Sequence, residues 1–323
     1  MMGKIQIYAC GGAGINLAMP LKDQPSQEGY ADLSVCFIDT SRSNFPAVIA
    51  QEDSFVLPGA DGSGKIRAMN YPEIANNVPQ ILGRFPTGDF NIVIHSASGG
   101  SGSVFGPLVA STIAKSGKPV VSLVVGSWES LITITNTINT LKSMDNIART
   151  SNVPLVFSFF NNQDNSKRKD VDSLVRLYIN RLACLVSGVH TELDSADISN
   201  WLRYDRNPNN QTPVGLAHLD IVETDEDALG IEYPISIASI HSGASSIGSI
   251  GADYQCAGIM KVDIVKAVGY EQQHYILSVH DVPELLKSLE QRKAELVQKQ
   301  QARPRTQALV DSGTATTDDG MVL

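Results

Sequence analysis

The segment Ser98-Gly99-Gly100-Ser101-Gly102-Ser103 stands between an apolar run at 90–95 and a helical pattern that begins at Val104. A second glycine-rich segment, Cys10-Gly11-Gly12-Ala13-Gly14-Ile15-Asn16, follows the apolar run at 5–8. Glycine allows positive φ and a close approach to a ligand, and the start of a helix offers free N–H groups and a positive dipole. Because this combination binds phosphate, two such loops on one sheet predict a nucleotide held from both sides.

Short apolar runs alternate with helical patterns in the first half of the chain, which favours an α/β fold with a mostly parallel sheet. Right-handed crossovers would bring the loops after these strands to one edge of the sheet, where α/β proteins bind ligands. The expected strands are 4–10, 33–39, 53–57, 90–95, 119–125 and 154–160. The loops expected to converge on one crevice are 11–16, 39–44, 58–65, 96–103, 126–130 and 161–167.

The second half begins with an amphipathic helical stripe over 171–186. After Pro208 the composition shifts to Gly, Ser and Ile, and we expect a further helix from Val282 that stops near Pro304. Residues 306–323 carry few large apolar groups, so they are expected to be disordered in the isolated chain. Strand-like runs lie at 235–241, 256–267 and 273–280.

Composition narrows the function classes. The 323 residues suffice for one large or two fused domains, and 42% hydrophobic and 18% charged residues are typical of a globular protein. No apolar run reaches the length of a membrane span, and a net charge of −9 argues against broad nucleic-acid binding. We therefore expect neither a membrane nor nucleic acid as a direct partner. The cysteines and histidines show no metal-ligand spacing, so reduced thiols in the cytoplasm are expected.

Three motifs resemble those of the tubulin/FtsZ superfamily. The segment 99–103 stands where its members carry Gly-Gly-Gly-Thr-Gly-Ser/Thr-Gly, with Val104 in place of the last glycine. The loop 11–16 resembles the first phosphate loop of FtsZ, and Leu193-Asp194-Ser195-Ala196-Asp197 resembles its catalytic run Asn-x-Asp-x-x-Asp. With the acidic end at 318–323 after a long helix, nearly the whole chain resembles bacteriophage tubulins of the PhuZ type.

The resemblance implies a GTP-binding domain at 1–167, a central helix at 168–188 and a smaller α+β activation domain at 189–281. It also implies a C-terminal helix at 282–304 and a flexible acidic tail at 305–323 that contacts a neighbouring subunit. The implied ligand is GTP or GDP, with Mg²⁺ as cofactor. The resemblance and the loops together assign these residues to the nucleotide: Gly11, Gly12, Ala13, Gly14, Asn16, Asp39, Gly59, Ala60, Asp61, Gly62, Ser98, Gly99, Gly100, Ser101, Gly102, Ser103, Glu129, Asn161, Asn162 and Asp172.

Some of these assignments have alternatives. A Rossmann dinucleotide fingerprint needs glycine where Leu17 stands, and Asp39 would touch a ribose in such a protein but phosphate and Mg²⁺ in a tubulin. The run 59–66 almost spells a Walker A loop, but Ile66 replaces the Ser/Thr that binds Mg²⁺. By resemblance this run is instead the loop that senses the γ-phosphate, and Glu129 stands where FtsZ has a ribose-contacting glutamate.

Fewer residues of the sequence indicate how the nucleoside is bound. Asn161 and Asn162 match the family position that contacts the nucleoside, and their amides can pair with a guanine edge. Asp172 offers a second contact, and Arg168 can stack on a base in place of an aromatic residue. The preference for guanine over adenine rests on the resemblance.

Asp194 and Asp197 are the predicted catalytic residues. Their spacing lets both carboxylates face one way at a helix start, where the alternative role for Asp194 is an N-cap. In tubulins the matching acids reach the γ-phosphate of the next subunit and orient the attacking water. Glu192 stands where the family carries asparagine.

The resemblance thus implies a filament-forming GTPase whose hydrolysis is completed at a subunit interface. In phage tubulins such filaments position phage DNA compartments or move capsids in the cytoplasm of the infected bacterium. Two alternatives remain: a TubZ-like filament that segregates DNA through an adaptor, and a Rossmann-type oxidoreductase.

Overall fold

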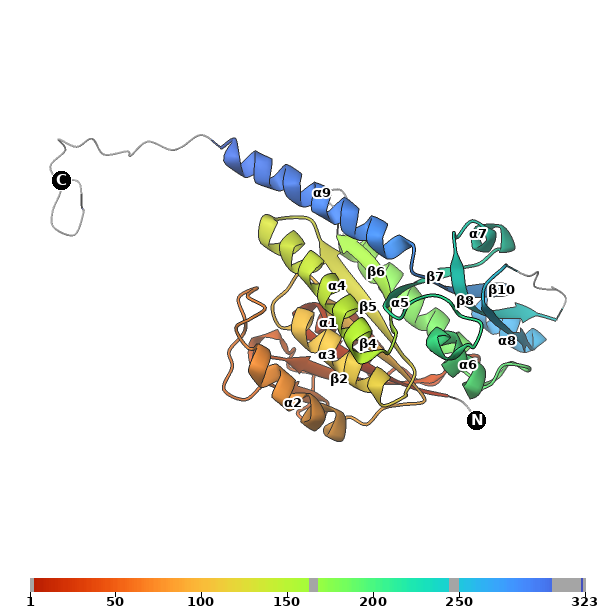
Figure 1. Cartoon of the computed structure of the whole chain (residues 1–323). Coiled ribbons are helices and arrows are strands. Elements are labelled where there is room, and N and C mark those ends of the chain that lie inside the picture. The colour runs from red at the N-terminus through yellow and green to blue at the C-terminus, as the bar shows by residue number, and fades with distance from the viewer. Residues whose placement is uncertain (1–2, 163–167, 244–249, 304–320, 322–323) are drawn as a thin grey trace.

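The computed structural model describes residues 3–162, 168–243, 250–303 and 321 (Figure 1). The strands are β1 (Lys4–Cys10), β2 (Asp32–Asp39), β3 (Ser54–Val56), β4 (Phe90–Ser96), β5 (Val120–Ser127), β6 (Leu155–Asn162), β7 (Leu216–Val222), β8 (Pro234–Ser242), β9 (Tyr254–Met260) and β10 (Gln272–Ser278). The α-helices are α1 (Gly11–Ala18), α2 (Tyr71–Arg84), α3 (Gly102–Lys115), α4 (Leu131–Ser151), α5 (Arg168–Leu185), α6 (Ser195–Leu202), α7 (Asp225–Leu229), α8 (Val262–Val268) and α9 (Asp281–Gln301). Short 3-10 turns are η1 (Met19–Leu21), η2 (Arg42–Asn44) and η3 (Tyr204–Arg206).

All of these strands belong to one ten-stranded sheet, in the order β3-β2-β1-β4-β5-β6-β7-β10-β8-β9. Every pair from β3 to β7 in this order is parallel, and β10 runs antiparallel to both β7 and β8. The loops after β1, β2, β4, β5 and β6 therefore leave the sheet at the same edge. The predicted fold class, a mostly parallel α/β sheet, is confirmed.

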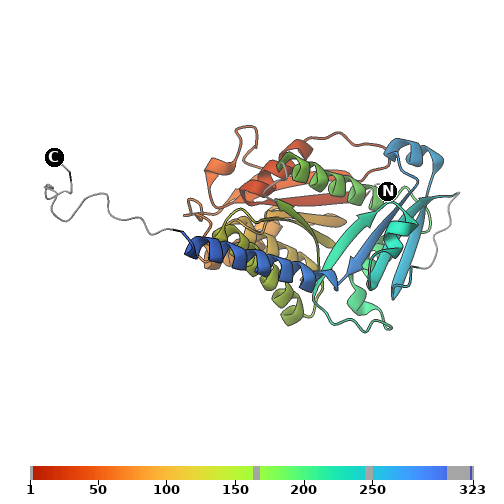
Figure 2. The same ribbon diagram turned by 90° about the horizontal axis from the view of Figure 1, so that it is seen from above.

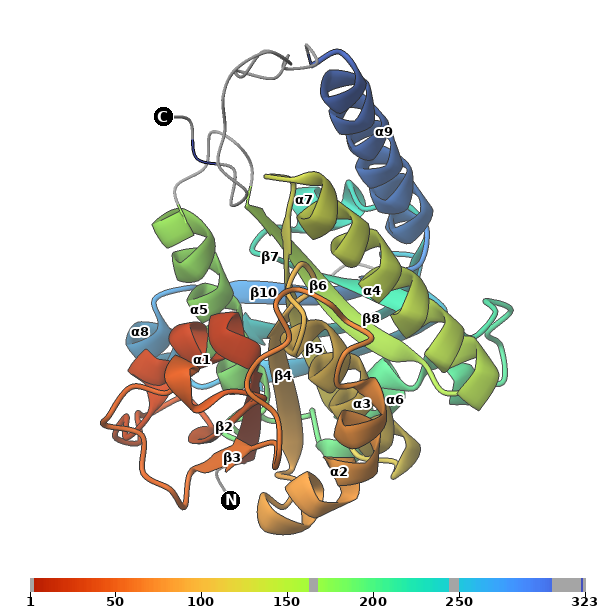
Figure 3. The ribbon, with the colours of Figure 1, turned by 90° about the vertical axis from the view of Figure 1, so that its left-hand side faces the viewer.

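Helices cover both faces of the sheet (Figure 3). Helices α1 and α5 pack on one face, and α2, α3 and α4 pack on the other. The strands supply both cores through their alternating side chains: Ile5 and Ile7 belong to the first core and Tyr8 to the second. The two views in Figures 1 and 2 show α9 running along α4, where Lys142 and Glu290 form an ion pair of 2.7 Å.

The strands expected in the first half are present with small shifts at their ends. The expected strand at 256–267 is wrong in its second part, because β9 ends at Met260 and α8 follows. The β-branched residues there favour a strand locally. The chain nevertheless forms α8, which ends at Val268 and is capped by Gly269 in the left-handed conformation (φ +81°).

Strand β7 is absent from the sequence-based expectation. It alternates between buried and half-buried residues, a pattern that its short length made weak. β7 extends the parallel sheet beyond β6, so the sheet continues without a break into the region expected to form a second domain. No helix within the described residues is both long and apolar enough to cross a bilayer.

Candidate nucleotide site and the opposite end of the sheet

The two glycine-rich loops meet backbone to backbone at the ends of the neighbouring strands β1 and β4. Gly11 has a φ of +75°, and a Cβ on it would lie 2.8 Å from the Cα of Gly102. A Cβ on Gly102 would lie 2.7 Å from the carbonyl oxygen of Cys10. Since α1 begins at Gly11 and α3 at Gly102, this close approach places two helix starts, with their free N–H groups, next to each other.

Hydroxyl groups connect three loops around Ser101. The Ser101 Oγ lies 2.6 Å from the Thr40 Oγ1, after β2, and 2.8 Å from the Ser63 Oγ. Gly100 makes room for this contact, because a Cβ there would lie 2.3 Å from the Ser63 Oγ. The loops after β2, β3 and β4 are thus held together by neutral oxygens, which are suitable donors to phosphate and ligands to Mg²⁺.

Residues 59–70, which we call the strap, lie over the loop 98–103. Gly59, Gly62, Gly64 and Lys65 all have positive φ in the strap. The Asn136 side chain of α4 donates to the carbonyl of Lys65 at 2.9 Å and to that of Ser98 at 3.1 Å, so it joins the strap to the loop. A Walker A loop would continue directly into a helix at its lysine, but α2 begins only at Tyr71.

Asp39, at the end of β2, is completely buried. Its carboxylate accepts hydrogen bonds from the Thr40 N–H and from the Asn44 Nδ2, each at 2.6 Å. The Asn44 side chain in turn lies against Gly12, where a Cβ would be 3.3 Å from the Asn44 Cγ. Asp39 therefore fixes Asn44 beside the first glycine-rich loop.

A cavity of about 350 Å³ opens beside these loops at the carboxyl edge of the sheet. It brings together predicted residues from the loops after β1, β4, β5 and β6 and from the start of α5. It is lined by Ala13, Asn16, Leu17, Lys65, Ser96, Ser98, Gly99, Val125, Ser127, Glu129, Thr133, Asn162, Arg168 and Asp172.

The two neighbouring asparagines of β6 have different places. Asn162 lines the cavity, and its Oδ1 is buried without a hydrogen-bond partner among the described residues. Asn161 does not line it, since successive side chains of a strand point to opposite faces. Both polar atoms of the Asn161 amide are also buried without a partner among the described residues. Only Asn162 is therefore placed to meet a ligand in this cavity.

Glu129 and Arg168 form an ion pair at the cavity, with a distance of 3.1 Å between Oε1 and Nη2. Their side chains are 45% and 75% exposed, so the pair contributes little to stability and can separate readily. Asp172 lies one helical turn further along α5 and also faces the cavity. Two carboxylates and one guanidinium thus surround the part of the cavity nearest α5.

The predicted catalytic acids form a capping box at the start of α6. The Asp194 carboxylate accepts from the N–H of Ala196 at 2.7 Å and of Asp197 at 3.0 Å, and the Asp197 carboxylate accepts from the Asp194 N–H at 3.0 Å. Asp197 also accepts from the Tyr254 hydroxyl at 3.1 Å. Burial, then Cys256 and Asp197, raise the pKa of Tyr254, which keeps this hydroxyl protonated as a donor. Asp194 is nonetheless exposed.

The acids lie at the opposite end of the sheet from the cavity. Helix α6 contributes Ser199 to a small surface depression whose other lining residues include Pro119 and Pro154, which directly precede β5 and β6. The cavity lies at the other ends of these strands. Strand β5 has eight residues and so extends about 26 Å, at about 3.3 Å per residue. The two acids therefore cannot reach a ligand in the cavity of their own chain.

A second cleft, of about 620 Å³, lies between α4 and α9. It is lined by apolar, neutral polar and basic side chains, and it shares the acidic Glu129 with the first cavity. The C-terminal part of α9 contributes Leu296 and Lys299, Arg303 follows the helix, and the start of α4 contributes Leu131 and Ile132. Residues 304–320, including the acidic Asp318 and Asp319, lie outside the described part of the chain.

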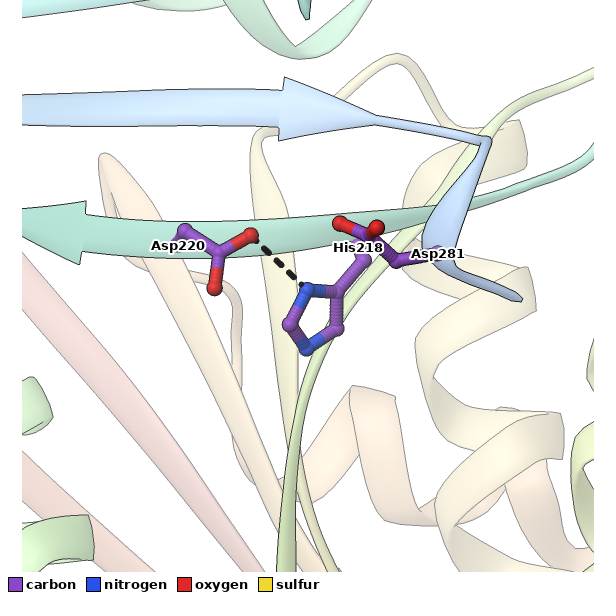
Figure 4. A group of neighbouring side chains, drawn as sticks. All are labelled: His218, Asp220 and Asp281. Carbon is purple, nitrogen blue, oxygen red and sulfur yellow. Dashed lines mark hydrogen bonds and ion pairs between the residues drawn. The ribbon is translucent and has the colours of Figure 1, made fainter. Parts of the chain in front are cut away.

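One group of potential metal ligands occurs among the described residues: His218, Asp220 and Asp281 (Figure 4). The His218 Nδ1 lies 3.0 Å from the Asp220 Oδ2, and the Asp281 Oδ2 accepts from the Ser278 hydroxyl at 2.8 Å. The first contact lies within β7, and the second attaches the first turn of α9 to the end of β10, so the printed contacts of the cluster are structural.

Several contributors to the site were not singled out by the sequence. Thr40, Asn44 and Ser63 lie in two of the loops expected to converge, 39–44 and 58–65, but no motif distinguished them, and Asn136 lies in a helix outside those loops. Asn136 is the clearest case, since a polar residue of an amphipathic helix is ordinarily expected on the solvent side.

Two glycine-rich loops beside a cavity at the carboxyl edge, with paired acids at the far edge, define the class of protein: a nucleotide-binding member of the tubulin/FtsZ superfamily. The profile of the phage tubulin-like protein C-terminal domain matches residues 193–281. The phage tubulin-like protein of Pseudomonas phage PhiPA3 is 32% identical over 321 residues, which cover 99% of each chain.

Solved structures give the same result. The structure of the phage tubulin PhuZ with GDP matches with a TM-score of 0.88 and 29% identity over 99% of each chain. The protofilament of TubZ from bacteriophage PhiKZ matches with a TM-score of 0.85 and 28% identity, also over 99% of each chain. The chain therefore belongs to the phage tubulin-like proteins, and the resemblance found in the sequence is confirmed.

Proposed function

We propose that this protein binds GTP in the cavity, assembles head to tail into filaments, and completes GTP hydrolysis at the contact between subunits. The observation that carries the proposal is the separation of the site into two halves. The nucleotide cavity and the acids Asp194 and Asp197 lie at opposite ends of the sheet, at least one strand length apart. Stacking one chain on the next in the same orientation would bring the acids of one over the cavity of the other.

The cavity suits a guanine nucleotide. The helix starts at Gly11 and Gly102 favour the phosphates, and the unpaired Oδ1 of Asn162 can accept from an amino or imino group of the base. A relative of the same fold was solved with GDP. The hydroxyls of Thr40 and Ser101 and the nearby Asp39 would supply the oxygen ligands that Mg²⁺ requires, and the ion would offset phosphate charge.

The acids suit the activation of water. Asp194 is exposed, and its backbone position is fixed by the capping box. In the assembled filament, Asp194 and Asp197 would orient a water and accept its proton as its oxygen attacks the γ-phosphorus. The bond from that phosphorus to the β–γ bridging oxygen breaks, which releases phosphate and leaves GDP.

The C-terminal segment is proposed to contact a neighbouring subunit. The cleft between α4 and α9 carries the basic Lys299 and Arg303 beside apolar side chains. The last residues of the chain combine Asp318 and Asp319 with the apolar run 321–323. The two surfaces are complementary in charge and polarity, so the tail of one subunit would fill the cleft of another.

In the cell, such filaments would act in the cytoplasm of the infected bacterium, where they would position phage DNA or move capsids. The sequence resemblance to phage tubulins of the PhuZ type supports this role.

Mixing two inactive variants tests the separation of the site. Gly99→Val would block the cavity but keep the acids, and Asp194→Asn would keep the cavity but remove the catalytic carboxylate. Each variant alone should hydrolyse GTP slowly, whereas the mixture should hydrolyse faster than the sum of the two. Co-sedimentation of both variants in one pellet is measured alongside phosphate release. Mixed filaments that show no gain in hydrolysis would contradict the proposal.

A further inference from the structure

Arg67, in the strap, has an unusual environment. Its Nε donates to the Ser103 Oγ at 3.2 Å, and its Nη2 donates to the Ser103 carbonyl at 3.4 Å and to the Ser143 Oγ at 3.3 Å. The side chain is half-buried, and burial lowers the pKa of its guanidinium. None of the described aspartates and glutamates forms an ion pair with Arg67. A desolvated cation without a carboxylate partner is costly unless another anion compensates it.

The place of Arg67 indicates what that anion is. Ser103 is in the first turn of α3, and its hydroxyl also donates to the Gly100 carbonyl at 2.9 Å. A cation at the start of a helix has the unfavourable sign for the helix dipole. An anion bound at the loop that Ser103 supports would compensate both the desolvated charge of Arg67 and its unfavourable position at the helix start. The missing counter-charge therefore belongs at the phosphate loop.

Arg67 also connects this loop to more distant elements. Within the strap, Ser63 contacts Ser101, and on the far side of Arg67 the Ser143 hydroxyl belongs to α4. The residue before it, Lys142, forms the ion pair with Glu290 of α9. The position of the strap over the phosphates is thus linked through Arg67 to the helix pair that lines the second cleft.

We propose that Arg67 is a positioning residue that holds the strap over the phosphate loop and makes the site prefer a nucleoside triphosphate to a diphosphate. The inference rests on the proposed function, since it concerns the same cavity. The additional charge of the third phosphate compensates the guanidinium, and the strap then closes in the position seen here. With a diphosphate, Arg67 keeps its unfavourable environment and the strap is held less firmly.

Nucleotide affinities of the full-length chain test this assignment. Displacement of a fluorescent GDP analogue gives the affinities for GTP and GDP in the wild type, Arg67→Gln and Arg67→Lys. Arg84→Gln, which removes an arginine at the far end of α2, is the matched control. We expect Arg67→Gln to weaken GTP about tenfold and GDP less than threefold, because the guanidinium that holds the strap and whose charge the third phosphate compensates is lost. Arg67→Lys should fall between the wild type and Arg67→Gln, because it keeps the charge but not the fork of donors.

The outcomes distinguish a failure of the proposed function from a failure of the role assigned to Arg67. If the wild type binds no guanine nucleotide, the proposed function is wrong and the assignment of Arg67 falls with it. If the wild type prefers GTP and Arg67→Gln loses GTP and GDP affinity equally, the proposed function stands and the assignment is overturned. A loss in Arg67→Lys as large as that in Arg67→Gln would also overturn it, since charge would then have no role. Far-ultraviolet circular dichroism and melting temperature verify that each variant is folded.

Discussion

The two ends of the sheet are built by opposite means. At the carboxyl edge, Gly11, Gly100 and Gly102 permit contacts that a single methyl group would prevent, so the shape of the backbone defines the site. At the amino edge, Asp194 and Asp197 are ordinary capping residues in their own chain, and the second role that we propose for them requires a neighbouring subunit. Under the proposed function, one half of the site is complete in the monomer, whereas the other half acts only on a neighbouring subunit.

The largest effect is expected from a substitution that fills the cavity at the carboxyl edge without disturbing the fold. Gly99 lines the cavity, and a Cβ there would have no neighbour closer than 4.0 Å. Gly99→Val should therefore fold normally and lose about 100-fold or more in GTP affinity, because phosphate hydrogen bonds worth about 3 kcal/mol are blocked. Gly83→Val, at an equally open position on α2, is the control. Isothermal titration with GTP measures the effect, and wild-type affinity in Gly99→Val would exclude this loop from phosphate binding.

Two substitutions of Asp194 separate its role as an N-cap from its proposed catalytic role. Asparagine is as good an N-cap as aspartate, so Asp194→Asn should keep stability, whereas Asp194→Ala should lose about 1 kcal/mol. Both should retain GTP binding and assembly, and both should slow phosphate release in filaments about 100-fold, because the proton acceptor is gone. Urea denaturation and phosphate release are measured on the same samples. If Asp194→Asn hydrolysed GTP at the wild-type rate within filaments, Asp194 would be a cap and nothing more.

This contrast also explains what the sequence could predict. Glycines at a strand–helix junction have few structural alternatives, so the loops at 11–16 and 98–103 predicted the cavity directly. A pair of aspartates three apart at a helix start has a common structural explanation, and only the family resemblance pointed beyond it. The contacts of Asn136 and Arg67 join elements that are distant in the chain, so local patterns did not indicate them. The placement of Asn161 away from the cavity follows from strand alternation, which the family position alone does not reveal.

A smaller effect is expected where the proposed subunit contact involves the tail. Deleting residues 311–323 should leave GTP affinity unchanged and raise the critical concentration for assembly about fivefold to tenfold, since two or three exposed ion pairs contribute about 0.2–1 kcal/mol each. Lys299→Glu in the cleft should act in the same direction, and raised salt should weaken wild-type assembly through screening. Light scattering with GTP is the measurement. Normal assembly of the truncated chain would show that the tail is dispensable for polymerisation.

An effect on stability alone is expected from the tight packing at the carboxyl edge of the sheet. His95 of β4 is completely buried, and a Cβ on Gly106 of α3 would lie 2.2 Å from its ring. Burial, as the main cause, lowers the pKa of His95 from 6.5 to about 4. The unfolded chain therefore binds a proton that the folded chain excludes as the pH falls from 6.5 towards 4, so His95 makes the free energy of unfolding decrease over that range. Between pH 6.5 and 5 the loss from this residue is at most about 2 kcal/mol.

Removing the imidazole should remove this part of the pH dependence. His95 has no hydrogen-bond partner for either ring nitrogen among the described residues, so His95→Leu leaves no donor or acceptor unpaired. Burial also lowers the pKa values of His190 and His274, and these contribute with the same sign in both proteins. The comparison is therefore the difference in urea unfolding between wild type and His95→Leu at pH 6.5 and at pH 5. The variant should lose less stability on acidification. An identical loss in both would mean that the β4–α3 contact accommodates a charged imidazole, and the nucleotide end would then be less rigid than its glycines indicate.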